Sequence, residues 1–301
     1  VLFLGGTFKQ ILLEVMMKKK FLALAAVLLA GVSTLHAENG MFSGYLPENW
    51  TADVVASMKY TRHYYNNWSE DGTNTSTWLF RYDADIKGNW KYANWRNLIN
   101  LSWGQNYTKG NGTRKSEDKI FWESTVDFNL FKVIKPYAGG RFESQFVKGF
   151  SYDDEGNKTP ISTFMDPAYI TQFAGLAYVP NDMFSQRLAF ANRMTISEGY
   201  GFADDPDTKK FEGFRDEPGL ESITEFKYGF MDIASFKSRL WAFVNFEGVE
   251  EIDGRWENTL AVMLTPYIEI SIGVELFYDK DLDEDMQYKD SMLFGLTWRW
   301  F

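Results

Sequence analysis

Apolar and polar residues alternate along most of the chain beyond about residue 50, and this period of two restricts the fold more than any other feature. Between Ile268 and Leu276 the even-numbered residues are isoleucine, valine or leucine, whereas the odd-numbered ones are glutamate, serine or glycine. A helix would scatter these glutamates around its axis, but a strand separates the two kinds of residue onto two faces. Residues 78–86 and 120–130 repeat the pattern. The alternation predicts an all-β fold.

About twelve alternating segments follow one another, an even number as in single-chain bacterial membrane barrels. They run over residues 51–66, 75–91, 94–108, 117–132, 136–149, 168–179, 184–198, 219–232, 235–249, 254–265, 267–279 and 287–301. Tight turns near Tyr92, Ile134, Asn181, Ala234 and Pro266 alternate with mostly longer polar connections at 67–74, 109–116, 150–167, 199–218, 250–253 and 280–286. This rhythm predicts a single antiparallel transmembrane β-barrel, with short periplasmic turns and longer outer loops.

Prolines and tryptophans fit the same arrangement. Every proline falls at a predicted turn, loop or strand start: Pro47, Pro136, Pro160, Pro167, Pro180, Pro206, Pro218 and Pro266. A proline inside a closed membrane barrel would remove a ladder hydrogen bond that no water could replace. Most of the 11 tryptophans gather near the expected periplasmic ends (Trp90, Trp95, Trp298, Trp300) or the outer ends (Trp68, Trp78, Trp122, Trp256). Two aromatic girdles at the membrane interfaces are expected; a buried aromatic core is the alternative.

The N-terminal region predicts export. Lys18, Lys19 and Lys20 precede the apolar run 21–32, which is too short to span a bilayer, and cleavage is expected after Ala37. We therefore expect an upstream extension with a mis-called start at 1–15, a signal peptide at 16–37, a periplasmic segment at 38–50 and the barrel at 51–301. The predicted location is the outer membrane. A net charge of −10 disfavours nucleic acid, and the absence of cysteine excludes disulfides, thiol nucleophiles and cysteine-bound zinc.

The C-terminal residues resemble the signal that the barrel-assembly machinery recognises in outer-membrane barrels. The resemblance rests on Gly295, Trp298, Trp300 and the terminal Phe301. Two departures are that the match ends one residue before the terminus and that Leu293 stands where a polar residue is preferred. The resemblance implies that the assembly machinery is a partner. Outer-membrane lipid and lipopolysaccharide are the other expected partners.

Three stretches are similar to an uncharacterised family of predicted Gram-negative outer-membrane barrels, a domain-of-unknown-function family. They are 66–69 (NNWS), 115–120 (KSEDKI) and 161–169 (ISTFMDPAY), and with their spacing they extend over most of the mature chain. The resemblance implies a barrel fold and an outer-membrane location. It implies neither catalytic residues nor a substrate.

Charged residues on the polar face of the strands should point into the barrel lumen. The predicted lumen network comprises Arg81, Asp83, Asp85, Lys87, Glu123, Asp127, Arg141, Glu143, Arg187, Arg193, Lys237, Arg239, Glu257, Glu269, Glu275 and Arg299. Two hypotheses remain open for it: a polar passage or binding barrel for small solutes, and a mutually neutralising network that closes a structural or surface-interaction barrel. Four inward rings, Phe121, Trp241, Phe243 and Phe277, would narrow any passage.

Two further groups were considered for chemistry. Asp279, Asp281, Asp283 and Asp285 alternate like the start of a calcium loop, although Glu284 replaces the glycine that such a loop needs. Calcium at this loop is the only cofactor considered, and a solvated acidic loop is the default. A lipid- or peptide-hydrolysing enzyme is the last alternative. It would have to use His63 with Ser57, Ser69 or Ser102, but nothing local pairs a nucleophile with a base, so we assign no catalytic residue.

Overall fold

The computed structural model describes residues 46–63, 74–153, 155–204, 212–231, 233–246, 252–279 and 283–299. The expected upstream extension, the signal peptide and residues 38–45 of the expected periplasmic segment lie outside these ranges. The compact unit from Glu48 to Arg299 contains every strand found in the described ranges. Among the described residues, none belongs to a helix long and apolar enough to cross a membrane.

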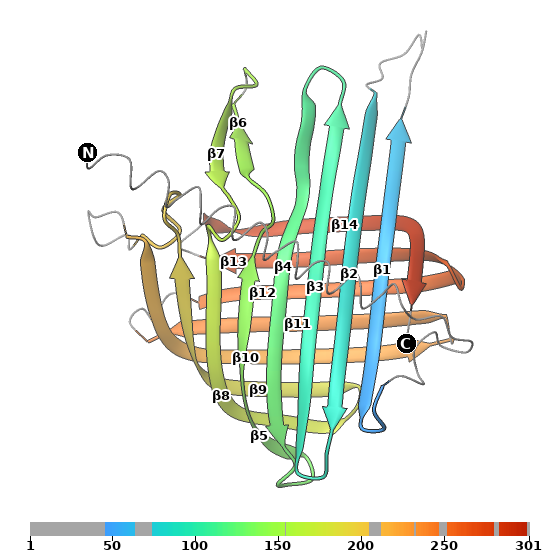
Figure 1. Cartoon of the computed structure of the whole chain (residues 1–301), viewed down its shortest axis with the longest axis vertical. Coiled ribbons are helices and arrows are strands. Elements are labelled where there is room, and N and C mark those ends of the chain that lie inside the picture. The colour runs from blue at the N-terminus through green and yellow to red at the C-terminus, as the bar shows by residue number, and fades with distance from the viewer. Residues whose placement is uncertain are drawn as a thin grey trace, which may run out of the picture. The chain divides into compact units, whose positions relative to one another are not determined.

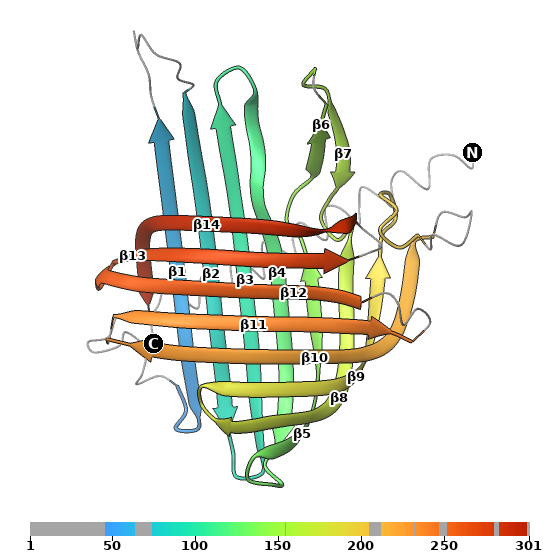
Figure 2. The same ribbon diagram turned by 180° about the vertical axis from the view of Figure 1, so that it is seen from behind.

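Twelve antiparallel strands close into a barrel, in which each strand pairs with its neighbours in sequence order and β1 pairs with β14. The barrel strands are β1 (Trp50–His63), β2 (Thr75–Asn89), β3 (Ala93–Thr108), β4 (Gly112–Phe128), β5 (Ile134–Ser144), β8 (Ala168–Asn181), β9 (Phe184–Ile196), β10 (Phe214–Phe230), β11 (Ala234–Asn245), β12 (Ile252–Thr265), β13 (Ile268–Asp279) and β14 (Asp283–Arg299). The strands are strongly tilted, so β1–β4 cross the direction of β10–β14 on the opposite wall (Figures 1 and 2). The predicted fold and strand number are confirmed.

Short and long connections alternate around the barrel. We call the end with residues 90–92, 129–133, 182–183, 231–233 and 266–267 the turn end, and the opposite end the loop end. Several predicted loops are too long: residues 112–116 of the expected loop 109–116 belong to β4, 214–218 of 199–218 to β10, and 283–286 of 280–286 to β14. Only 109–111 therefore connect β3 to β4. Gly110 and Gly112, with φ of 96° and 77°, permit this tight connection because glycine adopts positive φ without strain.

The connection between β5 and β8 is also more ordered than predicted. It contains a hairpin of β6 (Gly149–Tyr152) and β7 (Lys158–Ser162), which extends beyond the barrel at the loop end (Figure 1). At its tip, the backbone N–H and side-chain amide of Asn157 donate to Asp153 at 2.7 and 2.9 Å, and these bonds lower the pKa of Asp153. The strands are too short and polar for the alternation to indicate them, and their pairing depends on this turn.

Pro218 departs from its expected position in a loop, because β10 begins earlier, at Phe214. The carbonyl of Pro218 accepts a hydrogen bond from the backbone N–H of Phe246 at 3.0 Å, one residue beyond the end of β11. The N–H that proline lacks therefore falls where the β10–β11 ladder stops, so little pairing is lost.

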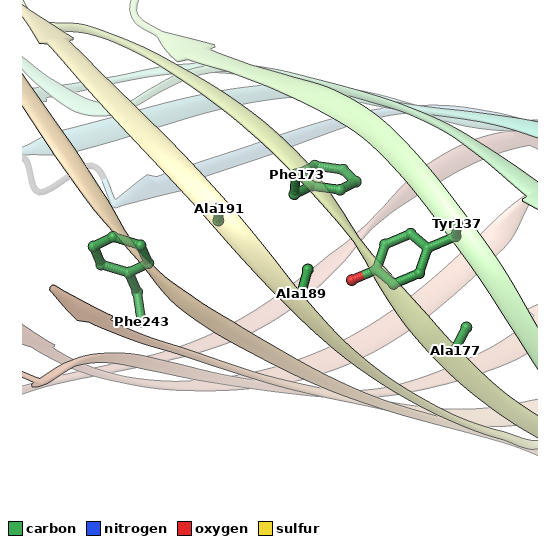
Figure 3. Packing of buried hydrophobic residues seen from close by; sticks show 6 residues of the cluster. All are labelled: Tyr137, Phe173, Ala177, Ala189, Ala191 and Phe243. Carbon is green, nitrogen blue, oxygen red and sulfur yellow. The ribbon is translucent and has the colours of Figure 1, made fainter. Parts of the chain in front are cut away.

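Side chains alternate across the barrel wall in the reverse sense to a soluble protein. On β9, Leu188 and Phe190 are 56% and 70% exposed on the outer surface, whereas Arg187 and Ala189 are buried inside. The apolar core is small and lies within the lumen, where Tyr137, Phe173 and Phe243 pack with Ala177, Ala189 and Ala191 (Figure 3). Large apolar residues therefore face outward, and buried charges face inward.

Candidate functional site

The lumen is filled on one side and hollow on the other. The filled side lies against β5, β8, β9 and β10, where the small apolar core is extended by Glu123, Arg141 and Glu221, all at most 4% exposed. Alanines on β8 and β9 leave room for the rings of Tyr137 and Phe173 to reach over these strands (Figure 3). Charged residues buried this deeply must be paired, because an isolated buried charge costs much free energy.

Glu123 on β4 is the centre of the ion-pair network. Its carboxylate accepts hydrogen bonds from Nε and Nη2 of Arg141 at 3.0 and 2.9 Å and from Nη1 of Arg187 at 2.8 Å. It also accepts one from Nη2 of Arg239 at 2.9 Å, from the opposite wall. Three guanidinium groups thus share one buried carboxylate, which ties β4 to β5, β9 and β11.

Two further carboxylates extend the network along β10. Glu221 accepts from Nη1 of Arg141 at 2.6 Å and from the indole N–H of Trp241 at 2.8 Å. Glu225 accepts from Arg239 at 2.6 Å and from Nη1 of Arg96 at 3.0 Å. Since Arg96 lies on β3 and Glu225 on β10, this part of the network also crosses the lumen.

A cavity of about 1210 Å³ occupies the other side of the lumen. Its lining includes Asn181 and Phe184 at the turn end and Gln145, Pro167 and Lys289 toward the loop end, so it follows most of the barrel's length. Twelve acidic and eleven basic residues line it, which makes its wall nearly neutral despite a high density of charge.

Several ion pairs bridge opposite walls of this cavity. Lys119 on β4 reaches Glu257 on β12 at 3.3 Å, and Arg255 on β12 lies 3.5 Å from Glu143 on β5. Lys289 on β14 bonds Glu117 on β4 at 2.9 Å. These pairs narrow the cavity without filling it.

Most of the predicted lumen charges line the cavity or the filled side. The cavity is lined by Arg81, Asp83, Asp85, Lys87, Asp127, Glu143, Arg187, Lys237, Arg239, Glu257, Glu269 and Glu275. Glu123 and Arg141 belong to the filled side, and Arg193 pairs with Asp253 at 2.7 Å. The side chain of Arg299 lies outside the described residues.

Other lumen charges were missed by the sequence reasoning: Lys59, Arg96, Glu117, Lys119, Glu221, Glu225, Asp253, Arg255 and Lys289. Strand parity could have found several of them. Arg255, for example, is two residues from the predicted Glu257, and alternate residues of a strand share a face.

The predicted inward rings stand beside lumen arginines. Phe121 lies under Arg239, whose Cζ is 5.8 Å from the ring centroid, and Phe277 lies under Arg255 at 4.7 Å. Trp241 and Phe243 stack in parallel on β11 with centroids 6.4 Å apart. Phe121 and Phe277 hold their guanidinium groups in place by cation–π attraction and by packing.

Two of the stretches with family resemblance meet at the loop end. Asp118, from the stretch 115–120, accepts backbone hydrogen bonds from Phe146 at 2.7 Å and Val147 at 3.0 Å, and Lys115 at 3.0 Å. Gln145 donates to the carbonyls of Thr163 and Asp166 in the stretch 161–169 at 2.9 and 3.1 Å. These bonds fasten the segment 145–167 to the barrel rim.

Asp166 makes a second anchor. Its carboxylate accepts from the Ser197 hydroxyl at 2.6 Å and from the backbone N–H of Gly199 at 2.9 Å, so it joins the β5–β8 connection to the β9–β10 connection. The peptide bond from Asp166 to Pro167 is cis. The stretch 66–69 lies outside the described residues.

The residues considered for hydrolysis are separated. His63 lies at the loop end of β1 opposite Thr75, whereas Ser57 is opposite Arg81. Six strand residues separate the two, or about 20 Å. Ser102 instead donates to Glu117 at 3.2 Å, and Ser69 lies outside the described residues.

The calcium candidates lie at the β13–β14 connection. Asp281 and the side chain of Asp283 lie outside the described residues, and Asp279 is buried with an oxygen 3.9 Å from Nη2 of Arg193. Asp285 also interacts with another group, so its carboxylate is not free. Within the part of the chain that the structure describes, no three carboxylates or histidines are grouped to hold a metal ion.

The assembly-signal residues lie at the seam between β1 and β14. A Cβ at Gly295 would be 2.5 Å from Cγ of Lys59 and 2.8 Å from the carbonyl of Met58, so glycine allows the two strands to meet. Trp298 faces outward opposite Ala56. Trp300 and Phe301 lie outside the described residues.

Comparison with known proteins confirms the resemblance to a family of unknown function. Residues 60–150 match the model of the family described as "Protein of unknown function (DUF3078)". The match includes the stretches 66–69 and 115–120 but ends before 161–169. No curated protein is significantly similar to the chain.

Solved structures with a similar architecture include a porin, an outer-membrane channel and an autotransporter domain. The NanC porin is 10% identical with a TM-score of 0.40, over 82% of this chain and 99% of the porin. An outer-membrane channel from Pseudomonas putida F1 is 10% identical with a TM-score of 0.41, over 88% and 99%. The translocator domain of the autotransporter NalP from Neisseria meningitidis is 10% identical with a TM-score of 0.36, over 85% and 90%. These similarities are too distant to assign a solute.

Proposed function

We propose that the chain is an outer-membrane barrel with a narrow passage for small hydrophilic solutes. The reversed alternation supports the membrane location: exposed side chains such as Phe190, Met292 and Phe294 would form a large apolar surface in water, whereas lipid solvates them. Outward tryptophans support the two girdles. Trp90, Trp95 and Trp298 lie toward the turn end, and Trp78 and Trp256 toward the loop end, whereas Trp122 lies nearer the turn end of β4 than its loop end.

The cavity is the observation that carries the passage. It follows the lumen from residues of the turn end to residues near the loop end, and its wall is polar and charged. Twelve strands leave more interior space than the eight-stranded barrels whose side chains fill them. The ion pairs that cross the cavity would limit the passage to small solutes. Because acidic and basic lining residues nearly balance, we expect weak selectivity between simple cations and anions.

Export, partners and calcium remain part of this proposal. A cleaved signal peptide at 16–37 would deliver the chain to the periplasm, and the C-terminal residues would engage the barrel-assembly machinery. Membrane lipid would cover the outward apolar surface, with lipopolysaccharide at the outer leaflet. For the β13–β14 connection the default is a solvated acidic loop, and calcium that bridges to lipopolysaccharide phosphates is the alternative.

The filled side of the lumen favours a second candidate, a closed structural or surface-interaction barrel. The network around Glu123 joins four strands, and such a network stabilises a barrel whether or not solute passes beside it. The two candidates differ in whether water and ions cross the remaining cavity.

Ion conductance of the refolded barrel in planar bilayers tests the proposal. A passage should give discrete current steps. Liposomes that carry the protein in their membrane should also swell in solutions of small sugars. Folding is checked by strand-type circular dichroism and by gel migration that changes on heating. Well-folded barrels that neither conduct nor permit swelling would establish the closed barrel instead.

A further inference from the structure

Arg187 lines the cavity and has a buried edge that makes no hydrogen bond. Its Nη1 donates to Glu123 at 2.8 Å, whereas its buried Nε and Nη2 have no hydrogen-bond partner among the residues that the structure describes. Nη2 forms an ion pair with the carboxylate of Glu225 at 3.6 Å, beyond hydrogen-bonding distance. Arg187 is only 6% exposed, and leaving buried donors unpaired costs free energy.

The other lumen arginines show what this edge binds. Arg96 holds Asp85 with Nε at 2.9 Å and Nη2 at 3.1 Å, while its Nη1 reaches Glu225. Arg141 uses Nε and Nη2 for Glu123 and Nη1 for Glu221. In both, the Nε–Nη2 edge binds one carboxylate and Nη1 binds another. Arg187 has the second partner, whereas its Nε–Nη2 edge makes no hydrogen bond and has only the 3.6 Å ion pair with Glu225.

Tyr137 adds a third unused donor beside this edge. Its hydroxyl is buried and has no hydrogen-bond partner within the described part of the chain, and its ring centroid is 5.9 Å from Cζ of Arg187. Figure 3 shows the ring extending from β5 toward Ala189 on β9. Both Tyr137 and Arg187 line the cavity, together with the small residues Ala177 and Val179.

The chemistry of the unused edge favours a carboxylate. The four arginines Arg96, Arg141, Arg187 and Arg239 are already balanced in charge by Asp85, Glu123, Glu221 and Glu225, so the preference comes from the geometry of the donors. Guanidinium binds a carboxylate through two parallel hydrogen bonds, which a neutral hydroxyl cannot reproduce.

We propose that the Nε–Nη2 edge of Arg187 and the hydroxyl of Tyr137 form a binding subsite for the carboxylate of a small organic acid in the passage. The carboxylate accepts two hydrogen bonds from Arg187 and one from Tyr137, and its aliphatic part faces Ala177 and Val179. Glu225 shifts away from Nη2 to admit it, and keeps its bonds to Arg96 and Arg239. This inference deepens the proposed function and rests on it, because solutes reach the subsite through the cavity.

Single-channel current with D-gluconate or sorbitol as the added probe tests the subsite, since the two differ mainly in carboxylate against hydroxymethyl. Gluconate should interrupt the current at concentrations at which sorbitol does not. Tyr137→Phe removes only the hydroxyl and should raise the half-blocking concentration of gluconate roughly tenfold, the effect of losing one hydrogen bond to a charged group. Tyr169→Phe, which removes another cavity-lining tyrosine hydroxyl, is the control. Its half-blocking concentration of gluconate should equal that of the wild type.

The outcomes separate this inference from the passage itself. The subsite is overturned if the barrel conducts but gluconate and sorbitol interrupt its current equally. It is also overturned if gluconate blocks the Tyr137→Phe variant at the same concentration as the wild type. The passage remains supported in both cases. A folded barrel that does not conduct overturns the passage. Titration calorimetry of the same variants with gluconate in detergent then decides the subsite, which is overturned if Tyr137→Phe does not weaken binding.

Discussion

Glu123 on β4 and Arg239 on β11 are 116 residues apart in sequence and are joined across the lumen by a 2.9 Å hydrogen bond. The same carboxylate accepts hydrogen bonds from Arg141 and Arg187, so one negative charge faces three guanidinium groups in a buried part of the barrel. The stability of the barrel and the width of its passage should both depend on this arrangement.

Glu123→Gln should lower the free energy of unfolding by about 3–5 kcal/mol, because it leaves buried guanidinium charge uncompensated. Urea unfolding in detergent measures the change. Glu275→Gln is the matched control: its partner Arg255 is 3.4 Å away and both are about 30% exposed, so a loss below about 1 kcal/mol is expected. Equal losses in the two variants would contradict the central role of Glu123.

Arg239→Ala should increase single-channel conductance, because it removes a cavity-lining side chain and the bonds it makes to Glu123 and Glu225. Lys132→Ala, in the exposed β4–β5 turn, should leave the conductance unchanged. An unaltered conductance in a folded Arg239→Ala barrel would place the narrowest part of the passage elsewhere.

Asp118→Asn should loosen the segment 145–167, because an amide oxygen replaces the two carboxylate oxygens that accept from Phe146, Val147 and Lys115. Trypsin should then cleave after Lys148 at least roughly tenfold faster, in line with the loss of a charge-assisted hydrogen bond. Mass spectrometry locates the cut. Asp290→Asn, on exposed β14, controls for the change of charge, and matching rates for the two variants would argue against the anchor.

Leu188→Arg should destabilise the barrel in lipid vesicles by about 2–4 kcal/mol, because it places a charge on the lipid-facing surface of β9. Leu130→Arg lies in the β4–β5 turn, where about 0–1 kcal/mol is expected. Urea unfolding from vesicles compares the two. Similar small effects for both would contradict the membrane location of the outer surface.

Local pattern was enough to predict the strands and their two faces. Residues 268–276 alternate strictly, and the structure places them in β13 with Glu269 and Glu275 in the cavity lining. Alternation also implied the missed Arg255, since it shares a face with Glu257. A period of two is a property of neighbouring residues, so it needs no knowledge of the rest of the chain. The alternation did not predict the β6–β7 hairpin, because its strands are short and polar and their pairing depends on the turn.

Only the tertiary structure decided which charges meet. Arg96 and Glu225 are 129 residues apart and bond across the lumen, and no local pattern links β3 to β10. Such pairs depend on the closure of the barrel and on the tilt of its strands. Together these determine the level of each side chain along the barrel and the strand that it faces across the lumen. The same geometry packs Glu123, Arg141 and Glu221 on one side and leaves the cavity on the other. The sequence alone determined that charge would line the lumen; closure of the barrel determined which partners each charge has and where space remains.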